Sequence, residues 1–237
     1  MNTPHPRRGT AFVLIGIVLY LLEFVGFALA GGYPSNEPGT PLDQIPIAYA
    51  GLAGGTGFLV GWMGVVLTGR ILIIIGLRSV IGRSVLMDWA VMAAVVSVAI
   101  EIVSVAAMAA GAALVADGAS LDAVLAADRI AWTTSGGAVA PAGVAALLTA
   151  VAMWRSTQFP RVLSGLGIAL GAVILVSGLL NGAPSTYPLA STLSIGVFGW
   201  FLWALWTGVL LVRRVRGVPG PGPDPINNPP AAAPSRP

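Results

Sequence analysis

Hydrophobic residues occur in six long runs along the chain, and each run has close to the roughly 20 residues that a helix needs to cross the hydrocarbon core of a membrane. None of the runs alternates polar with apolar residues as the strands of a membrane barrel do. Lipid offers no hydrogen-bond partner to a free backbone group, so the runs must be helical. The pattern predicts an all-α fold, a polytopic bundle of six transmembrane helices over residues 11–30, 47–69, 89–116, 137–154, 162–182 and 189–212.

The six runs divide the chain into three parts. Residues 1–9 form a short N-terminal tail, residues 10–213 form the transmembrane domain, and residues 214–237 form a C-terminal tail. Eight of the last 21 residues are proline, a composition that cannot bury a core, so this tail is predicted to be disordered. An even number of spans places both tails on the same side of the membrane.

Two segments beside the spans allow more than one interpretation. Residues 71–77 are apolar but lie between Arg70 and Arg78. They either extend the second helix beyond the lipid, with Arg70 reaching back to the headgroups, or lie along the inner surface. Residues 122–130, in an outer loop, have apolar side chains at helical spacing after Ser120, which predicts a short surface helix with Ser120 as its N-cap.

The composition agrees with a membrane protein and excludes several kinds of chemistry. Only 9% of the residues are charged, against about 25% in a soluble domain, and the mean hydropathy is +0.88. The chain has no Lys for a Schiff base and no Cys for thiolate catalysis or an iron–sulfur cluster, and its one His is His5 in the N-terminal tail. We therefore expect no metal site and no cofactor. The basic pI reflects charges at helix ends and does not indicate a nucleic-acid partner.

The orientation follows from the arginines, because basic residues concentrate on the cytoplasmic side. With the spans given above, eleven of the twelve arginines fall on one side and only Arg129 on the other. Five acidic residues show the opposite trend. The chain is predicted to have both termini in the cytoplasm. The acidic residues assigned to the outer loops are Glu37, Asp43, Asp117, Asp122 and Asp128.

The first span also has some features of a signal peptide. Arg7 and Arg8 precede it, and residues 28–30 read Ala-Leu-Ala, as at a cleavage site. However, its apolar run exceeds the roughly 7–15 residues of a signal core, and Glu23 interrupts it. We predict that the span is retained.

Two acidic residues, Glu23 and Glu101, lie deep within spans, where a charge costs at least about 2.5–3.5 kcal/mol. Each follows the start of its predicted span by twelve residues, so both lie about 18 Å from the inner boundary and are predicted to share one buried polar site. Arg70 is expected at the inner boundary, too far away to pair with them. The other members of this candidate site are Tyr20, Ser97 and Ser104, which lie at helical spacing from the two acids.

Small residues four positions apart allow two helix backbones to approach closely in lipid. The glycine-rich second span has Gly57 and Gly61 at this spacing, and the fifth span has Gly167 and Gly171. We predict that they pack the bundle internally, although a dimer face or a substrate groove would use the same spacing. The partners expected for the chain are membrane lipids and either a second copy or another membrane protein.

Three tryptophans follow one another at three-residue steps in the sixth span: Trp200, Trp203 and Trp206. Such a stripe either stacks on a ligand, faces lipid or fills the bundle interior.

The entry to the fifth span resembles that of a bacterial six-helix membrane family of unknown function. The matching residues are Ser156, Pro160, Arg161, Leu163, Gly165 and Gly167, followed by Gly171, and Glu101 in the third span is also similar. The resemblance covers the layout of residues 10–213. It implies a multi-pass protein of the bacterial cytoplasmic membrane and brings no established activity.

Three classes of function are compatible with these features. The first, which we prefer, is a non-enzymatic accessory, sensing or small-ligand-binding bundle. The second is a small proton- or cation-coupled transporter that uses Glu23 and Glu101. The third is an intramembrane lipid-modifying enzyme, but diphosphate chemistry needs clustered acids for a metal and the inner loops offer only Asp88.

Overall fold

The computed structural model describes residues 6–30, 39–52, 55–181 and 185–217. The C-terminal tail beyond residue 217, with Arg236, and His5 lie outside these ranges. Within them the chain is helical and contains no strand. The helices are α1 (Pro6–Leu29), α2 (Ile45–Ala50), α3 (Thr56–Val66), α4 (Thr68–Ile81), α5 (Val85–Ala116), α6 (Leu121–Arg155), α7 (Arg161–Leu180), α8 (Tyr187–Leu193) and α9 (Ile195–Gly217).

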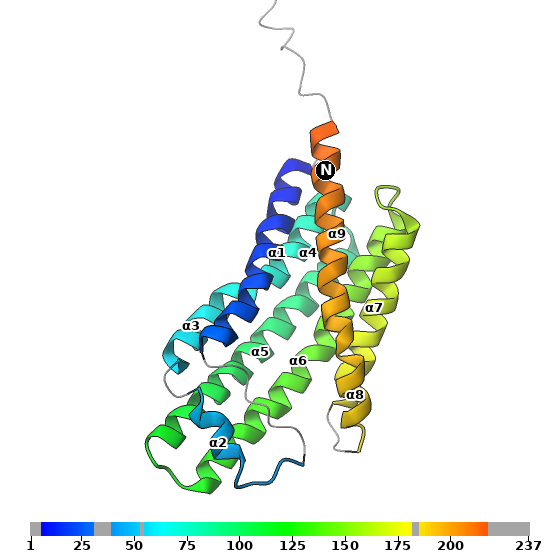
Figure 1. Ribbon diagram of the computed structural model, residues 1–237. Helices are drawn as coiled ribbons and strands as arrows, with labels where there is room; N and C mark the ends of the chain where they lie inside the picture. Colours follow the sequence, from blue (N-terminus) through cyan, green and yellow to red (C-terminus); the bar gives the residue numbers. More distant parts are fainter. Residues whose placement is uncertain (1–5, 31–38, 53–54, 182–184, 218–237) are drawn as a thin grey trace, which may run out of the picture.

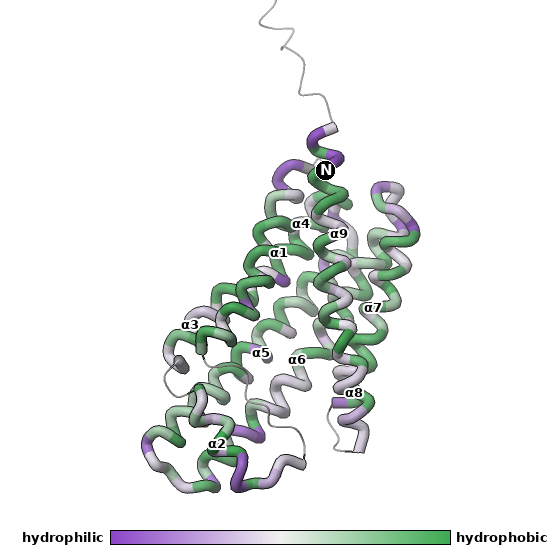
Figure 2. The backbone as a smooth tube through the Cα atoms, in the orientation of Figure 1, coloured by the Kyte–Doolittle hydropathy of each residue, from purple (hydrophilic) through white to green (hydrophobic). Residues whose placement is uncertain are grey.

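Six helical segments of the described chain are long and apolar enough to cross a membrane, which makes this a multi-pass membrane protein. They run side by side, and the start of α1 lies at the same end of the bundle as the end of α9 (Figure 1). Apolar residues cover most of the middle of the bundle, whereas polar residues gather toward its two ends (Figure 2). Large apolar side chains point outward along the spans, as lipid requires; Val18, Val103 and Leu202 are 55%, 50% and 64% exposed. The predicted all-α bundle of six spans is confirmed.

The second span lies further along the chain than predicted. It begins at Thr56 and ends at Ile81, and it consists of α3 and α4, which meet at Leu67. The residues before it form the separate short helix α2. Residues 71–77 are therefore part of the span, and Arg70 lies near its middle instead of at the inner boundary. From Arg70 to either end of the span is about 17–21 Å along the helix.

The fourth span begins earlier than predicted. Residues 122–130 do not form a separate surface helix, because α6 continues without a break from Leu121 to Arg155 and includes Pro141. Ser120 precedes the first turn, but its side chain makes no capping hydrogen bond. At 1.5 Å per residue, α6 is about 50 Å long, well beyond the roughly 30 Å of hydrocarbon.

The excess length of α5 and α6 forms a helical hairpin at the end of the bundle opposite the chain ends, which we call the hairpin end (Figure 1). The short helix α2 packs on this hairpin, and Tyr49 donates a hydrogen bond of 3.1 Å to Asp128. Tyr49 is almost fully buried and Asp128 is 7% exposed. Ile45 and Tyr49 of α2 thus join an apolar cluster that also includes buried residues of α3, α5 and α6.

The closest approach of two backbones around the second span occurs between the antiparallel helices α1 and α4. A Cβ atom placed on Gly16 would lie 2.5 Å from the carbonyl oxygen of Gly69, and one placed on Gly76 would lie 2.6 Å from that of Gly9. Only glycine fits these four positions, because no side-chain atom can occupy that space. α1 is thereby an integral wall of the bundle.

The predicted packing role of Gly57 and Gly61 is wrong within the single chain. Both are exposed on the outer surface of α3, and a Cβ atom on either would meet nothing within 4 Å. The error arises because the second span was predicted to end at residue 69. In the structure the span continues to Ile81, and the glycines on its face toward α1 are Gly69 and Gly76. A dimer face at Gly57 and Gly61 stays a prediction.

In the fifth span, α7 packs closely against α6 and α9. A Cβ atom on Gly171 would lie 2.5 Å from the backbone nitrogen of Leu147, and one on Gly167 would lie 2.8 Å from Ala150 and from the ring of Trp203. These two glycines lie where helices touch inside the bundle.

Candidate functional site

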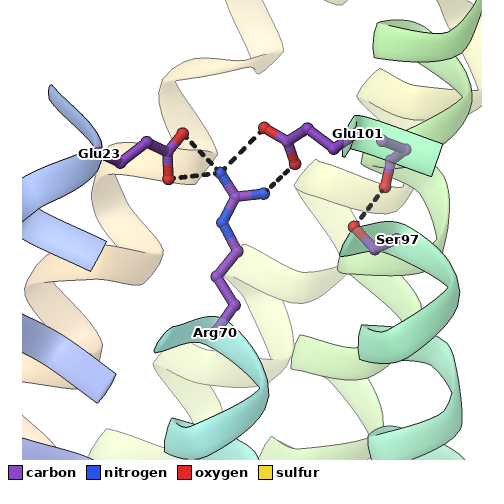
Figure 3. A network of polar contacts seen from close by, with 5 residues as sticks. Glu23, Arg70, Ser97 and Glu101 are labelled. Atoms are coloured by element: carbon purple, nitrogen blue, oxygen red, sulfur yellow. Dashed lines mark hydrogen bonds and ion pairs between the residues drawn. The ribbon is translucent and has the colours of Figure 1, made fainter. Parts of the chain in front are cut away.

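Arg70 joins Glu23 and Glu101 in the interior of the bundle (Figure 3). Its Nη2 atom lies 2.8 Å from both carboxylate oxygens of Glu23 and 3.2 Å from Oε1 of Glu101, and its Nη1 donates to Oε2 of Glu101. The expectation that no cation pairs with the two acids is therefore wrong. The expectation failed because the second span was predicted to end at residue 69, which put Arg70 at the inner boundary, whereas the span runs from Thr56 to Ile81. We call Glu23, Arg70 and Glu101 the triad.

Three helices supply one member of the triad each: α1, α4 and α5. The matched depth of the two acids brings them to the same level, and the close α1–α4 contact places Glu23 opposite Arg70. A guanidinium suits this position because its planar fork can donate to two carboxylates at once, which the single ammonium of a lysine does less well.

The triad is largely removed from solvent. The exposed fractions of its side chains are 10% for Glu23, 14% for Arg70 and 21% for Glu101. The guanidinium carbon of Arg70 also lies 5.0 Å from the centre of the Tyr20 ring, a cation–π distance. Tyr20 is 1% exposed, so it closes one side of the triad.

The formal charges of the triad do not balance. Two ionised carboxylates and one guanidinium leave a net charge of −1. An uncompensated charge at this depth costs at least about 2.5–3.5 kcal/mol. One proton or one monovalent cation would remove the excess, and this imbalance is the property of the site that bears most directly on function.

All three members of the triad line a central cavity of about 210 Å³. Residues of α1, α4, α5, α6, α7 and α9 line it, so every one of the six spans contributes. Away from the triad the walls are mostly apolar and small, with Ser97 and Ser135 as the hydroxyl-bearing exceptions. The apolar residues of the walls include Ala94, Ala138, Ala142, Ala145, Ile174 and Val197.

Two hydrogen-bond donors that belong to cavity-lining residues have no acceptor in the described structure. The indole Nε1 of Trp200 is one, although Trp200 is only 7% exposed, and Nε of Arg70 is the other. Buried polar groups are nearly always hydrogen-bonded, so each unsatisfied donor needs an explanation. A molecule in the cavity with an acceptor atom would satisfy one or both.

The remaining predicted site residues have different positions. Ser97 lines the cavity but donates its hydroxyl to the carbonyl oxygen of Ala138 at 2.8 Å. Ser104 makes the equivalent bond to Ala131, also at 2.8 Å, and is not among the residues that line the cavity. Both serines therefore fasten α5 to α6.

The tryptophan stripe of the sixth span divides between interior and surface. Trp200 stands edge-on to Tyr20 with 5.6 Å between ring centres, and Trp203 donates to the carbonyl oxygen of Leu163 at 2.8 Å. Trp206 is 46% exposed. Only Trp200 lines the cavity.

Within the described ranges, no three His, Cys, Asp or Glu side chains lie close enough together to hold a metal ion. No protein-family model, curated protein or solved structure matches this chain. The family resemblance around Pro160 and Arg161 stays a prediction.

Proposed function

We propose that this multi-pass membrane protein is a binding or sensing bundle that holds a small ligand in its central cavity. The observation that carries the proposal is the unbalanced triad in the lining of a cavity of about 210 Å³ that is also lined by Trp200, whose indole N–H has no acceptor among the described residues. A cavity built only for packing would have neither a buried charge excess nor an unsatisfied donor.

The lining indicates the chemistry of the ligand. An apolar cavity of about 150 Å³ in another protein takes up benzene, so this one suits a molecule slightly larger than a benzene ring. The carboxylates of Glu23 and Glu101 favour a cationic or hydrogen-bond-donating group on the ligand, and the unpaired indole N–H of Trp200 favours an acceptor group. A small aromatic or aliphatic amine with a hydroxyl group fits these requirements.

A series of three ring compounds tests this proposal. We expect 4-hydroxybenzylamine to raise the melting temperature of the detergent-solubilised protein more than 4-hydroxybenzyl alcohol, and 4-hydroxybenzoate to raise it least. The ring and hydroxyl are constant while the charge changes from +1 to −1. At ten times its dissociation constant a ligand adds about 1.4 kcal/mol of stability. For a chain of this size each kcal/mol raises the melting temperature by roughly 2–4 °C, so we expect a shift of about 3–6 °C.

Two leucine variants serve as the control for this series. Ala142→Leu fills the cavity and should abolish the response, whereas Ala99→Leu, at an exposed position on α5, should preserve it. Equal responses in the two variants, or no shift with any of the three compounds, would reject ligand binding in the cavity.

A proton- or cation-coupled transporter is the second candidate, and the net charge of −1 on the triad favours it. If an amine replaces a proton on the triad, binding releases that proton into weakly buffered solution. Measured proton release would favour the transporter, and binding without release would favour the sensing bundle.

We also propose that both termini face the cytoplasm. Among the described residues, nine arginines lie at the end of the bundle where α1 begins and α9 ends, which we call the Arg-rich end, and only Arg129 lies at the hairpin end. Arg70, inside the bundle, does not bear on the orientation. The nine are Arg7, Arg8, Arg78, Arg83, Arg155, Arg161, Arg213, Arg214 and Arg216.

Reporter fusions test the orientation. A reporter that is active only in the cytoplasm should be active when fused after Arg216 and silent when inserted beside Asp122. An insertion in the loop at residues 82–84 should agree with the fusion after Arg216. The reverse pattern would place the Arg-rich end outside.

A further inference from the structure

A second, smaller hollow of about 110 Å³ lies at the Arg-rich end, far along the bundle from the triad. Its polar rim consists of Arg7 at the start of α1, Arg214 near the end of α9, and Gln158 in the loop between α6 and α7. Its floor contains Thr10, Val80 and Leu211, which are 5%, 4% and 2% exposed. We call this hollow the rim groove.

The rim groove is electrostatically one-sided. No carboxylate is among the described residues that line it. Among the described residues, Asp88 is the one acidic residue at this end of the bundle, and it is already paired with Arg78. The guanidinium of Arg214 lies 5.3 Å from the centre of the Phe159 ring, which helps to hold it at the groove. Two cations without an anionic partner in the described structure therefore face one small hollow.

The depth of the groove decides what kind of anion it suits. Arg7 and Arg214 lie at helix ends, where long basic side chains reach the headgroup level of a membrane. A phosphate ester between two guanidiniums makes strong, charge-assisted hydrogen bonds. Beneath the rim the floor is largely apolar, and the partly exposed side chain of Val215 offers a surface that suits the first methylenes of an acyl chain and is of no use to a free ion. Basic pockets between membrane helices bind anionic headgroups in this way.

We propose that the rim groove is a binding site for the headgroup of an anionic phospholipid, with its phosphate between Arg7 and Arg214 and its polar headgroup against the Gln158 amide. The site is separate from the central cavity and does not depend on the function proposed for it.

Neighbouring arginines on the same two helices provide a matched control. Arg8 and Arg213 adjoin Arg7 and Arg214 in sequence but do not line the groove. The double variants Arg7→Gln/Arg214→Gln and Arg8→Gln/Arg213→Gln thus remove the same charge from the same helix ends. The measurement is retention of phosphatidylglycerol or phosphatidylcholine by the delipidated protein in neutral detergent, followed by native mass spectrometry.

The wild-type chain and the Arg8→Gln/Arg213→Gln variant should retain one phosphatidylglycerol in preference to phosphatidylcholine. The Arg7→Gln/Arg214→Gln variant should bind phosphatidylglycerol about 30-fold more weakly, since each basic residue near an anionic lipid contributes a factor of about five. If this double variant does not fold, Arg214→Gln alone should bind about fivefold more weakly.

Three outcomes would overturn the proposal. Equal losses in the two double variants would indicate a general attraction to the Arg-rich end without a site. Equal retention of phosphatidylglycerol and phosphatidylcholine would show that the groove does not distinguish lipids by the charge of the headgroup. Stabilisation by glycerol phosphate equal to that by phosphatidylglycerol would assign the groove to a soluble phosphate instead of a lipid.

Discussion

The Arg70→Leu variant is expected to lose about 3–5 kcal/mol of unfolding free energy, because it removes one partner of a buried ion pair and leaves charge without compensation. In this protein the loss exposes two carboxylates to one another, since Arg70 binds both Glu23 and Glu101. Unfolding of the detergent-solubilised protein, followed by tryptophan fluorescence, provides the measurement.

Two further variants separate the charge effect from the loss of side-chain volume. The triple variant Arg70→Leu/Glu23→Gln/Glu101→Gln has no formal charge in the triad and should regain most of the lost stability, because neutral replacement of a whole buried network is far less costly than breaking it. Arg70→Lys keeps the positive charge but loses the planar set of guanidinium donors. Its unfolding free energy should lie between those of Arg70→Leu and the wild-type protein. A triple variant no more stable than Arg70→Leu would show that packing, and not charge, holds this part of the bundle.

The candidate site could be predicted only in part. The sequence placed Glu23 and Glu101 at one depth because each is an isolated charge in an apolar run, and the structure brings them together. It did not place Arg70, because the boundaries of the second span are ambiguous. An apolar segment precedes Arg70 as well as following it, and a helix of the required length can be drawn over residues 47–69 or over 56–81. The choice depends on the separate helix α2 and its contact with the α5–α6 hairpin.

The same limit applies to the fold. Six spans follow from hydrophobicity alone, because the cost of a free backbone in lipid allows few other solutions. The continuity of α6 does not, since Asp122, Asp128 and Arg129 mark residues 122–130 as outside the membrane without showing whether they continue a helix or begin a loop. The hydrogen bond from Tyr49 to Asp128 joins residues 79 positions apart and has no local sequence signal.

Glycine positions show a further limit, because spacing identifies candidates but not the face they occupy. Gly57 and Gly61 have the four-residue spacing typical of close packing and yet lie on the outer surface. The pairs that do pack, Gly9 with Gly76 and Gly16 with Gly69, are seven residues apart on each helix and become visible only once α1 and α4 are aligned.

These positions give the second prediction of large effect. Gly16→Ala should already destabilise the protein, and Gly16→Leu should do so by about 3 kcal/mol, the upper part of the range for overpacked interiors. The reason is that the new Cβ atom would lie 2.5 Å from the Gly69 carbonyl oxygen and 2.8 Å from the backbone nitrogen of Ile73. Backbone atoms cannot rotate away as a side chain can, so α1 and α4 must separate.

Gly61 provides the matched control, because it lies in the same span as Gly69 but on the exposed face of α3. Gly61→Ala should leave stability unchanged or raise it by up to about 1 kcal/mol, since alanine favours a helix over glycine by that amount. The same substitution is thus expected to destabilise the protein at residue 16 but not at residue 61. The separation of α1 from α4 also moves Glu23 away from Arg70, so Gly16→Leu should reduce ligand binding in the central cavity while Gly61→Leu preserves it. Equal melting temperatures for Gly16→Leu and Gly61→Leu would contradict the close α1–α4 contact, and with it the geometry that brings Glu23 to the triad.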